Sequence, residues 1–260
     1  MPEPLAAALA RLTEPIVDDR NGLAVHSVAE IGPELRSRMF KLLQSCYEHV
    51  TEAQFELDLS EKEWAIVGVD RNSGNVWCFS TLKRIYLDES GGRMVAFYSG
   101  DTASRADTRG GATAAGTRLV VRKMFSEIAL HPEKAYYWFM ISSTYKSFRL
   151  LSALFSDFAP GPERPLTNDE RRRLSALSRI RGFDYDPVLS VVRFRNASVP
   201  RDDGSTDEAV KRSDHMAAFF AAANPGAATG ERLASLTRLS LENLTPLGLK
   251  FVLGPDADCE

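Results

Sequence analysis

The sequence predicts an α/β protein of the α+β kind, with a mixed, largely antiparallel central sheet flanked by helices. Three observations predict this class. Three consecutive strands, 64–69, 76–87 and 94–102, are separated by short turns, and tight turns connect antiparallel neighbours. A glycine turn then joins the third strand to a long helix. Finally, residues 135–143, AYYWFMISS, form a near-continuous apolar run, as expected for a strand buried on both faces.

The composition narrows the class of protein. The chain has 260 residues, of which 44% are hydrophobic, and a formal net charge of −3. These values fit a globular protein with a sizeable core and do not favour nucleic-acid binding through overall charge. No apolar run approaches the ~20 residues that span a bilayer, and the N-terminus is too acidic for a signal peptide. The cysteines are scattered without metal-binding spacing. We therefore expect a cytoplasmic protein with neither a membrane partner nor a metal.

The elements before the glycine turn follow from spacing and turn chemistry. Residues 24–29 form a short strand. Residues 33–50 are predicted to be a helix, because apolar residues recur at three- and four-residue spacing behind an initial proline. Residues 52–60 continue as a second helix. The turns DRNSGN and DESGGR then separate the antiparallel strands, so a doubly wound sheet with parallel strands and crossover helices fits poorly.

The elements after the glycine turn are predicted in the same way. Helical spacing or a capping residue indicates helices at 114–130, 144–158, 167–180 and 214–223. Short strand-like segments at 183–186 and 189–195 close this part of the chain.

The last quarter of the chain is expected to lie outside the sheet. Residues 198–213 are polar and turn-rich, which indicates a surface connection. We therefore divide the chain into a main domain, residues 1–197, and a C-terminal linker and helical extension, residues 198–260. The apolar face of the helix at 214–223 must pack on the main domain, a second subunit or a substrate channel. The oligomeric state stays open, with a homodimer among the alternatives.

The turn at 107–112 has the composition of an anion-binding site. It follows a strand and opens a helix, and adjacent glycines let the backbone approach a ligand closely. The free N–H groups of the first helical turn and the helix dipole favour an anion, for which a pyrophosphate is the natural candidate. The alternative is an ordinary strand-to-helix connection, which can also contain two glycines.

The order of elements over residues 24–195 resembles the GNAT superfamily of acyl-CoA N-acyltransferases. In that family the pattern Q/R-x-x-G-x-G/A binds the pyrophosphate of coenzyme A, and the matching run here is DTRGGA. Asp107 stands where the family has Gln or Arg, and its carboxylate repels a pyrophosphate unless it points away or caps the helix. The resemblance implies acyl-CoA as co-substrate and an amine of a small molecule as acceptor.

The resemblance also implies which residues bind the cofactor. They are Thr102, Ser104, Arg105, Thr108, Arg109, Gly110, Gly111, Ala112, Thr113 and Ser143.

Acyl transfer to an amine needs a base, an oxyanion donor and a general acid. Main-chain N–H groups at 102–104 are the candidate oxyanion donor. Here the strand at 94–102, the fourth of the chain, is expected to separate from the fifth, at 135–143. Asp101, at the end of the fourth strand, and Glu48, at the end of the first helix, are candidate bases. Tyr145, on the helix after the fifth strand, is the candidate acid. Each has a structural alternative: a turn carboxylate, a solvated helix end and a core tyrosine, respectively.

Two other functions stay open. Residues 164–195 contain eight arginines, which favour an anionic partner, so the acyl donor is alternatively a carrier protein or an aminoacyl-tRNA. The chain is alternatively a non-catalytic ligand-binding or interaction module, because a fold does not carry its function with it.

Overall fold

The computed structural model describes residues 12, 16–89, 92–105, 111–194, 198–201 and 213–254, apart from the side chains of 111–113. The helices of this part are α2 (Pro33–Cys46), α3 (Glu52–Ser60), α4 (Gly111–Leu130), α5 (Tyr145–Leu154), α6 (Asn168–Ile180), α8 (His215–Ala223) and α9 (Pro246–Leu253). The strands are β1 (Val17–Asp18), β2 (Leu23–Ser27), β3 (Tyr47–Glu48), β4 (Trp64–Val69), β5 (Val76–Glu89), β6 (Gly92–Ser104), β7 (Ala135–Ser142), β8 (Asp184–Asp186), β9 (Val191–Arg193), β10 (Val199–Pro200) and β11 (Arg232–Arg238). Across the described ranges, no helix has the length and apolar character that crossing a bilayer requires.

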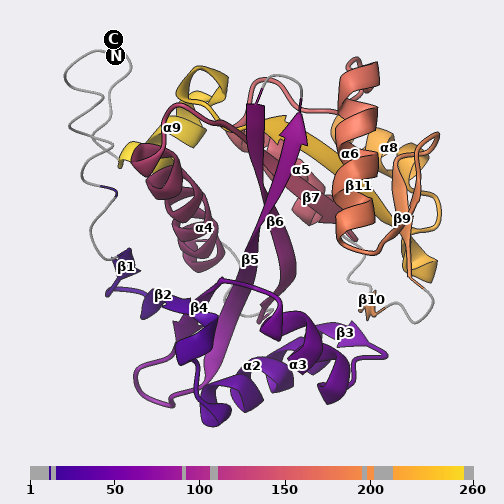
Figure 1. Ribbon diagram of the computed structural model, residues 1–260. Helices are drawn as coiled ribbons and strands as arrows, with labels where there is room; N and C mark the ends of the chain where they lie inside the picture. The colour runs from indigo at the N-terminus through magenta and orange to yellow at the C-terminus, as the bar shows by residue number, and fades with distance from the viewer. Residues whose placement is uncertain are drawn as a thin grey trace.

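The described strands build one large mixed sheet and one small pair (Figure 1). The large sheet has the order β1-β2-β4-β5-β6-β7-β11-β9-β8, and β3 pairs with β10. Neighbouring strands run antiparallel except β6 and β7, which are parallel. The fold class predicted from the sequence is therefore confirmed. The order of elements expected from the sequence is present as well: a strand, two helices, three antiparallel strands, a long helix, a buried strand and a further helix.

The C-terminal segment also contributes to the sheet. The expected helical extension contains α8 and α9, but the same segment supplies β11, which lies between β7 and β9. Leu233 pairs with Ser142 of β7 on one side and with Val191 of β9 on the other. Its central residues are buried, because both neighbours and both faces are covered. A strand at this position was not expected from the sequence.

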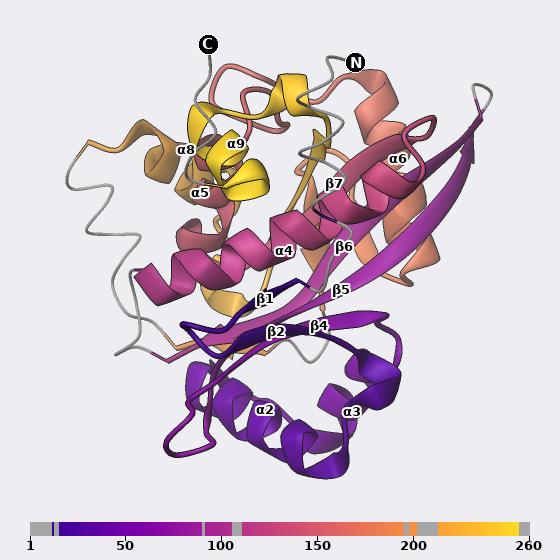
Figure 2. The ribbon, with the colours of Figure 1, turned by 90° about the vertical axis from the view of Figure 1, so that its left-hand side faces the viewer.

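Helices cover both faces of the sheet (Figure 2). On one face, α2 and α3 enclose a core that includes Met39 and Phe55, while α6 covers a second core on the later strands. On the other face, α4, α5, α8 and α9 enclose the largest core. Alternate residues of β6 divide between the faces: Phe97 belongs to the core beneath α4, and Tyr98 to the core beneath α6.

Helix α2 is shorter than the helix predicted at 33–50. It ends at Cys46, where the chain enters β3. His49 then adopts a positive φ of 59°, which a helix does not allow. Because the partner of β3 is the distant strand β10, local apolar spacing could not indicate this end. Glu48 therefore lies on a short strand and not in a helix.

We predict that Gly68→Ala lowers the free energy of unfolding by about 1–3 kcal/mol, the usual cost of overpacking a core. A Cβ at Gly68 would lie 2.5 Å from an indole carbon of Trp77, and the Trp77 side chain is buried. Chemical denaturation of the purified variant measures the change. A variant as stable as the original protein would contradict the packing described for β4.

The matched control is Gly116→Ala within α4. Its Cβ would meet only the Cys78 sulfur, at an ordinary contact distance of 3.5 Å. Alanine is favoured over glycine inside a helix by roughly 0.5–1 kcal/mol. This variant is therefore expected to gain stability.

Candidate functional site

The pairing between β6 and β7 ends before either strand does. Their parallel register runs from Met94 opposite Ala135 to Ser99 opposite Met140. Beyond this point β6 continues to Ser104 beside β5, while β7 stays paired with β11. The two central strands therefore separate into an open seam, as the sequence led us to expect for this part of β6.

A β-bulge occupies the start of the seam. Ser99 pairs with Leu82 of β5, whereas Thr102 pairs with Ser80. Gly100 and Asp101 therefore both lie opposite the single residue between them, Thr81. Bulges bend a strand and change where a side chain is directed. Here the bulge sets the position of Asp101, the candidate base.

Close packing favours glycine at position 100. A Cβ there would lie 2.4 Å from Cε of Lys62 and 2.6 Å from Oγ1 of Thr81. Both distances are shorter than any normal contact, so a larger residue would displace the Lys62 side chain. The Thr81 hydroxyl also donates a hydrogen bond to the carbonyl of Asp101, at 3.4 Å, which ties the bulge to β5.

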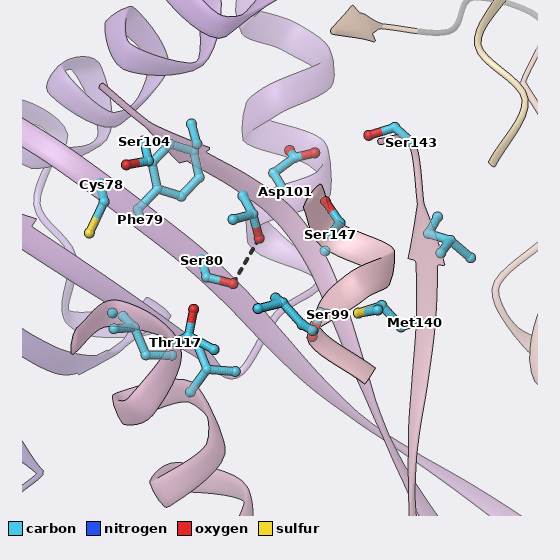
Figure 3. A pocket seen from close by; sticks show the side chains of 18 of the residues that line it. Cys78, Phe79, Ser80, Ser99, Asp101, Ser104, Thr117, Met140, Ser143 and Ser147 are labelled. Atoms are coloured by element: carbon cyan, nitrogen blue, oxygen red, sulfur yellow. Dashed lines mark hydrogen bonds between the residues drawn. The ribbon is translucent and has the colours of Figure 1, made fainter. Parts of the chain in front are cut away.

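One pocket fills the seam, and we call it the seam pocket (Figure 3). It encloses about 940 Å³, partly open to solvent. Figure 3 shows Asp101 on β6 and Ser143 directly after the end of β7, with Ser147 of α5 near them. Ser80 and Thr102, joined by a hydrogen bond of 2.8 Å between their hydroxyls, form part of the wall. The polar lining residues include Tyr47, Ser80, Ser99, Asp101, Thr102, Ser104, Thr117, Ser143, Ser147 and Arg232.

A second pocket lies between the two cores on the α2, α3 and α6 side of the sheet, and we call it the charged pocket. Its charged lining residues are Asp58, Lys62, Asp101, Arg181 and Arg232. Its aromatic lining residues are Phe55, Tyr98, Phe183 and Phe194. Asp101 and Arg232 line both pockets. A carboxylate and a guanidinium therefore stand between the two pockets and belong to the lining of both.

The electrostatic environment of Asp101 favours its neutral form. Burial raises the pKa of its carboxyl group, and the nearby Asp58 carboxylate raises it further. The positive charges of Lys62 and Arg232 oppose these effects without cancelling them. A carboxyl group with a raised pKa is a stronger base when ionised, which is the property a proton acceptor near neutral pH needs.

Tyr47 also lies at the seam. Its hydroxyl donates a hydrogen bond to the carbonyl oxygen of Thr102 at 3.1 Å. Burial raises the pKa of this hydroxyl, partly opposed by the charge of Arg232 and by a hydrogen bond with the Ser143 side chain. Tyr47 therefore stays protonated at neutral pH and bridges the two separated strands.

The structure places Tyr145 in the core. It is buried, packs against Phe220 of α8 and donates a hydrogen bond to the Asp214 carboxylate. Burial and this carboxylate raise its pKa to about 12. Asp214 in turn caps α8 by accepting from the N–H groups of Met216 and Ala217. Tyr145 is not among the lining residues of either pocket, so the structure does not bring it to Asp101.

Glu48 is also away from both pockets. It forms an ion pair with Arg201 at 3.0 Å, and both side chains are about half exposed.

The main-chain N–H of Arg105 donates a hydrogen bond to the carbonyl oxygen of Trp77, which places Arg105 at the end of the β5–β6 ladder. Among the predicted site residues, Asp101, Thr102, Ser104 and Ser143 are brought together.

The predicted pyrophosphate turn lies outside the described residues. Thr108, Arg109 and Gly110 fall in an undescribed segment, and only the backbone of Gly111, Ala112 and Thr113 is described, as the start of α4. The strand before the turn and the helix after it are confirmed as β6 and α4.

The pocket-lining residues that were missed from the sequence include Tyr47, Lys62 and Arg232. Tyr47 was assigned to a helix, and Arg232 to an extension outside the sheet. Lys62 precedes β4 as an ordinary loop lysine. One signal was available for Tyr47: it directly precedes Glu48, which the sequence analysis had considered as a candidate base. For the described residues, no group of three or more potential metal ligands is found.

Several solved structures are similar to this chain. A probable N-acyltransferase from Enterococcus faecalis aligns with a TM-score of 0.39 and 16% identity, over 52% of this chain and 33% of that one. An acetyltransferase from Trypanosoma brucei aligns with a TM-score of 0.37 and 15% identity, over 50% of this chain and 89% of that one. A GNAT family N-acetyltransferase from Escherichia coli in complex with CoA gives 0.35 and 17%, over 51% and 69%. The chain thus spans a third of the length of the Enterococcus protein. No protein-family model and no curated protein matches the sequence.

We predict that Asp101→Asn raises thermal stability at neutral pH. The folded-state pKa of Asp101 is raised above its unfolded value, so between these two values the folded state binds more protons. The free energy of unfolding therefore falls as pH rises from the unfolded-state pKa to the folded-state pKa. Above the folded-state pKa, the full cost of burying the ionised carboxylate remains. The variant removes this cost, and each kcal/mol gained raises Tm by about 2–4 °C. Tm measured from pH 4 to 8 should show an advantage that grows with pH.

The control is Asp186→Asn, because the pKa shift of Asp186 is opposite in direction to that of Asp101. The N–H groups of Leu189 and Val188 hold the pKa of Asp186 below its usual value. Loss of its charge is therefore expected to lower Tm at neutral pH. An Asp101→Asn variant that is destabilised at pH 8 would contradict the electrostatic description of the seam.

Proposed function

We propose that this chain is a divergent GNAT-like N-acyltransferase that moves an acyl group from acyl-CoA to an amine of a small molecule. One observation carries the proposal: two pockets lie at the seam of the central sheet, and Asp101 lines both. An acyl donor in one pocket and an amine in the other would meet at this carboxylate. Transfer between two bound substrates needs such a meeting point, because its rate depends on holding the reacting atoms together.

The seam pocket suits the thioester end of the donor. The carbonyl of Thr102 accepts from Tyr47 and therefore faces the seam. In an extended strand the N–H of the same residue shares that side. The Thr102 N–H is thus our candidate for the donor that stabilises the oxyanion when the amine attacks.

Asp101 is the proposed base. The amine nitrogen attacks the thioester carbonyl carbon, a C–N bond forms, and the carboxylate of Asp101 accepts the proton that the nitrogen loses. The C–S bond then breaks, and the sulfur leaves with its electron pair. The products are an N-acyl amide and the thiol form of CoA. A raised pKa suits this role, because a base matched to the working pH is the most effective.

Tyr47 is the proposed source of the proton for the leaving thiolate, in place of Tyr145. Its raised pKa keeps the hydroxyl protonated at neutral pH, and it lines the seam pocket. Tyr145 lines neither pocket, and its hydroxyl binds Asp214 in the core.

The arginine cluster gives less support to a carrier protein or a tRNA as donor. Its members are largely neutralised by carboxylates within the described part of the chain: Arg164 by Asp157 and Glu170, Arg172 by Asp169, Arg173 by Glu89, Arg181 by Glu61, and Arg193 by Asp186 and Glu231. Arginines already paired in this way offer a weaker attraction to a polyanion.

We predict that CoA and acetyl-CoA stabilise the protein in a thermal-shift experiment. A ligand at about 100 times its Kd adds roughly 2.7 kcal/mol to the free energy of unfolding. Gly110→Asp, which adds a second carboxylate to the expected pyrophosphate turn, should remove the shift. If neither ligand shifts Tm, the CoA assignment is wrong.

For the base, we predict that Asp101→Asn lowers kcat for acyl transfer by about 10²–10⁴-fold, the usual contribution of general base catalysis. CoA should still stabilise this variant, since the carboxylate is not expected to bind the donor. In the original protein kcat should fall as pH drops through the raised pKa of Asp101. A pH-independent rate, or full activity in the variant, would exclude Asp101 as the base.

A further inference from the structure

The charged pocket contains cations without carboxylate partners. Within the described ranges, neither Lys62 nor Arg232 forms an ion pair. The ammonium of Lys62 donates to the main-chain carbonyl of Asp58 at 2.7 Å. The guanidinium of Arg232 donates to the carbonyl and hydroxyl oxygens of Ser198, at 3.2 and 2.9 Å. Both side chains line the pocket, where a ligand carboxylate could reach them.

Aromatic rings fix the orientation of the two guanidinium groups in this pocket. Arg232 lies over Phe194, 4.8 Å from the ring centroid. Arg181 lies over Tyr98 and Phe183, at 5.1 and 5.4 Å. Stacking uses the faces of the planar groups and leaves their N–H edges for hydrogen bonds. Arg181 is paired with a carboxylate, that of Glu61.

Some of those N–H groups lack acceptors. The Nε atoms of Arg181 and Arg232 are buried and have no hydrogen-bond partner among the described residues. A buried donor without an acceptor is costly, and both of these arginines line the charged pocket. A carboxylate matches the guanidinium edge, because its two oxygens can accept two parallel N–H bonds. The pocket thus has positions for an anionic group as well as for an amine.

The charged pocket is lined by carboxylates as well as by cations. Asp101, the proposed base, lines the seam together with Arg232, and Asp58 adds a second carboxylate. Burial lowers the pKa of Lys62, and the charge of Arg181 adds to this effect, while Asp58, Asp101 and Glu61 oppose it. A ligand with one amine and one carboxylate would complement this set.

Resting on the proposed function, we propose that the acceptor is an α-amino acid with an apolar or aromatic side chain. Its carboxylate would bind the guanidinium of Arg232, its amine would face Asp101, and its side chain would contact the rings of Phe183 and Phe194. An amine that lacks the carboxylate would leave the cations of the pocket buried and unpaired, which disfavours its binding.

Isothermal titration calorimetry on the full chain tests this assignment without requiring turnover. The probes are phenylalanine, 3-phenylpropionate and phenethylamine, which share the aromatic group and differ in amine and carboxylate. Phenylalanine and 3-phenylpropionate are expected to bind at least about tenfold more tightly than phenethylamine. Equal or tighter binding of phenethylamine would overturn the inference.

The variant Arg232→Met removes the charge while keeping an extended side chain. We expect it to weaken phenylalanine binding by about tenfold or more and to affect phenethylamine less. Arg238→Met is the matched control, because Arg238 is an exposed arginine at the end of the same strand; it should bind all three probes as the original chain does. If Arg232→Met does not fold, Arg232→Lys, which keeps the charge but loses the planar fork, should bind phenylalanine more weakly than the original chain. Unchanged phenylalanine binding in a folded Arg232 variant would refute the assignment.

Steady-state acylation with acetyl-CoA separates this inference from the proposed function. Phenylalanine acylated with a higher kcat/KM than phenethylamine supports both. A higher kcat/KM for phenethylamine overturns the amino acid assignment and leaves the acyltransferase standing. Tight binding of phenylalanine, lost in Arg232→Met but without acylation of any amine, supports the carboxylate site and argues against acyl transfer.

Discussion

The site depends on the end of backbone pairing between β6 and β7. Through Ser99 and Met140 the two strands share one hydrogen-bonded ladder. After that point each strand keeps a partner on its outer side only, β5 for β6 and β11 for β7. A sheet can open in its middle in this way because the outer ladders hold both strands in place. The bulge at Gly100 and Asp101 then bends β6 at the opening, and Tyr47 spans it with a hydrogen bond to Thr102.

The same opening has an electrostatic cost. Burial shifts the pKa of Asp101 upward and that of Lys62 downward. The charged form of each group is therefore less stable here than in water. A fold selected for stability alone would place apolar side chains at these positions. The carboxylate and ammonium therefore indicate a role in binding or chemistry, since strained ionisable groups gather at functional sites.

Much of the fold could be predicted from the sequence, because its elements depend on local patterns. The strand at 64–69 matches β4, and the alternation and turn chemistry around it located β5 and β6. The site was predicted less completely, because its residues come from segments that meet only in three dimensions. Asp101 was among the residues proposed from the sequence, because the strand predicted at 94–102 ends beside it; in the structure β6 continues to Ser104. Tyr47 and Arg232 were missed: one depends on β3 pairing with distant β10, the other on β11 inserting between β7 and β9.

The position of β11 also bears on how the protein comes to be folded during synthesis. Until this strand has left the ribosome, the edges of β7 and β9 that it will join have no partner, and Arg232 is missing from the pockets. Loop closure over such a separation is slow compared with the formation of neighbouring hairpins. The nascent chain therefore exposes two strand edges that can pair with other chains. Insertion of β11 both covers these edges and adds Arg232 to the lining of the two pockets.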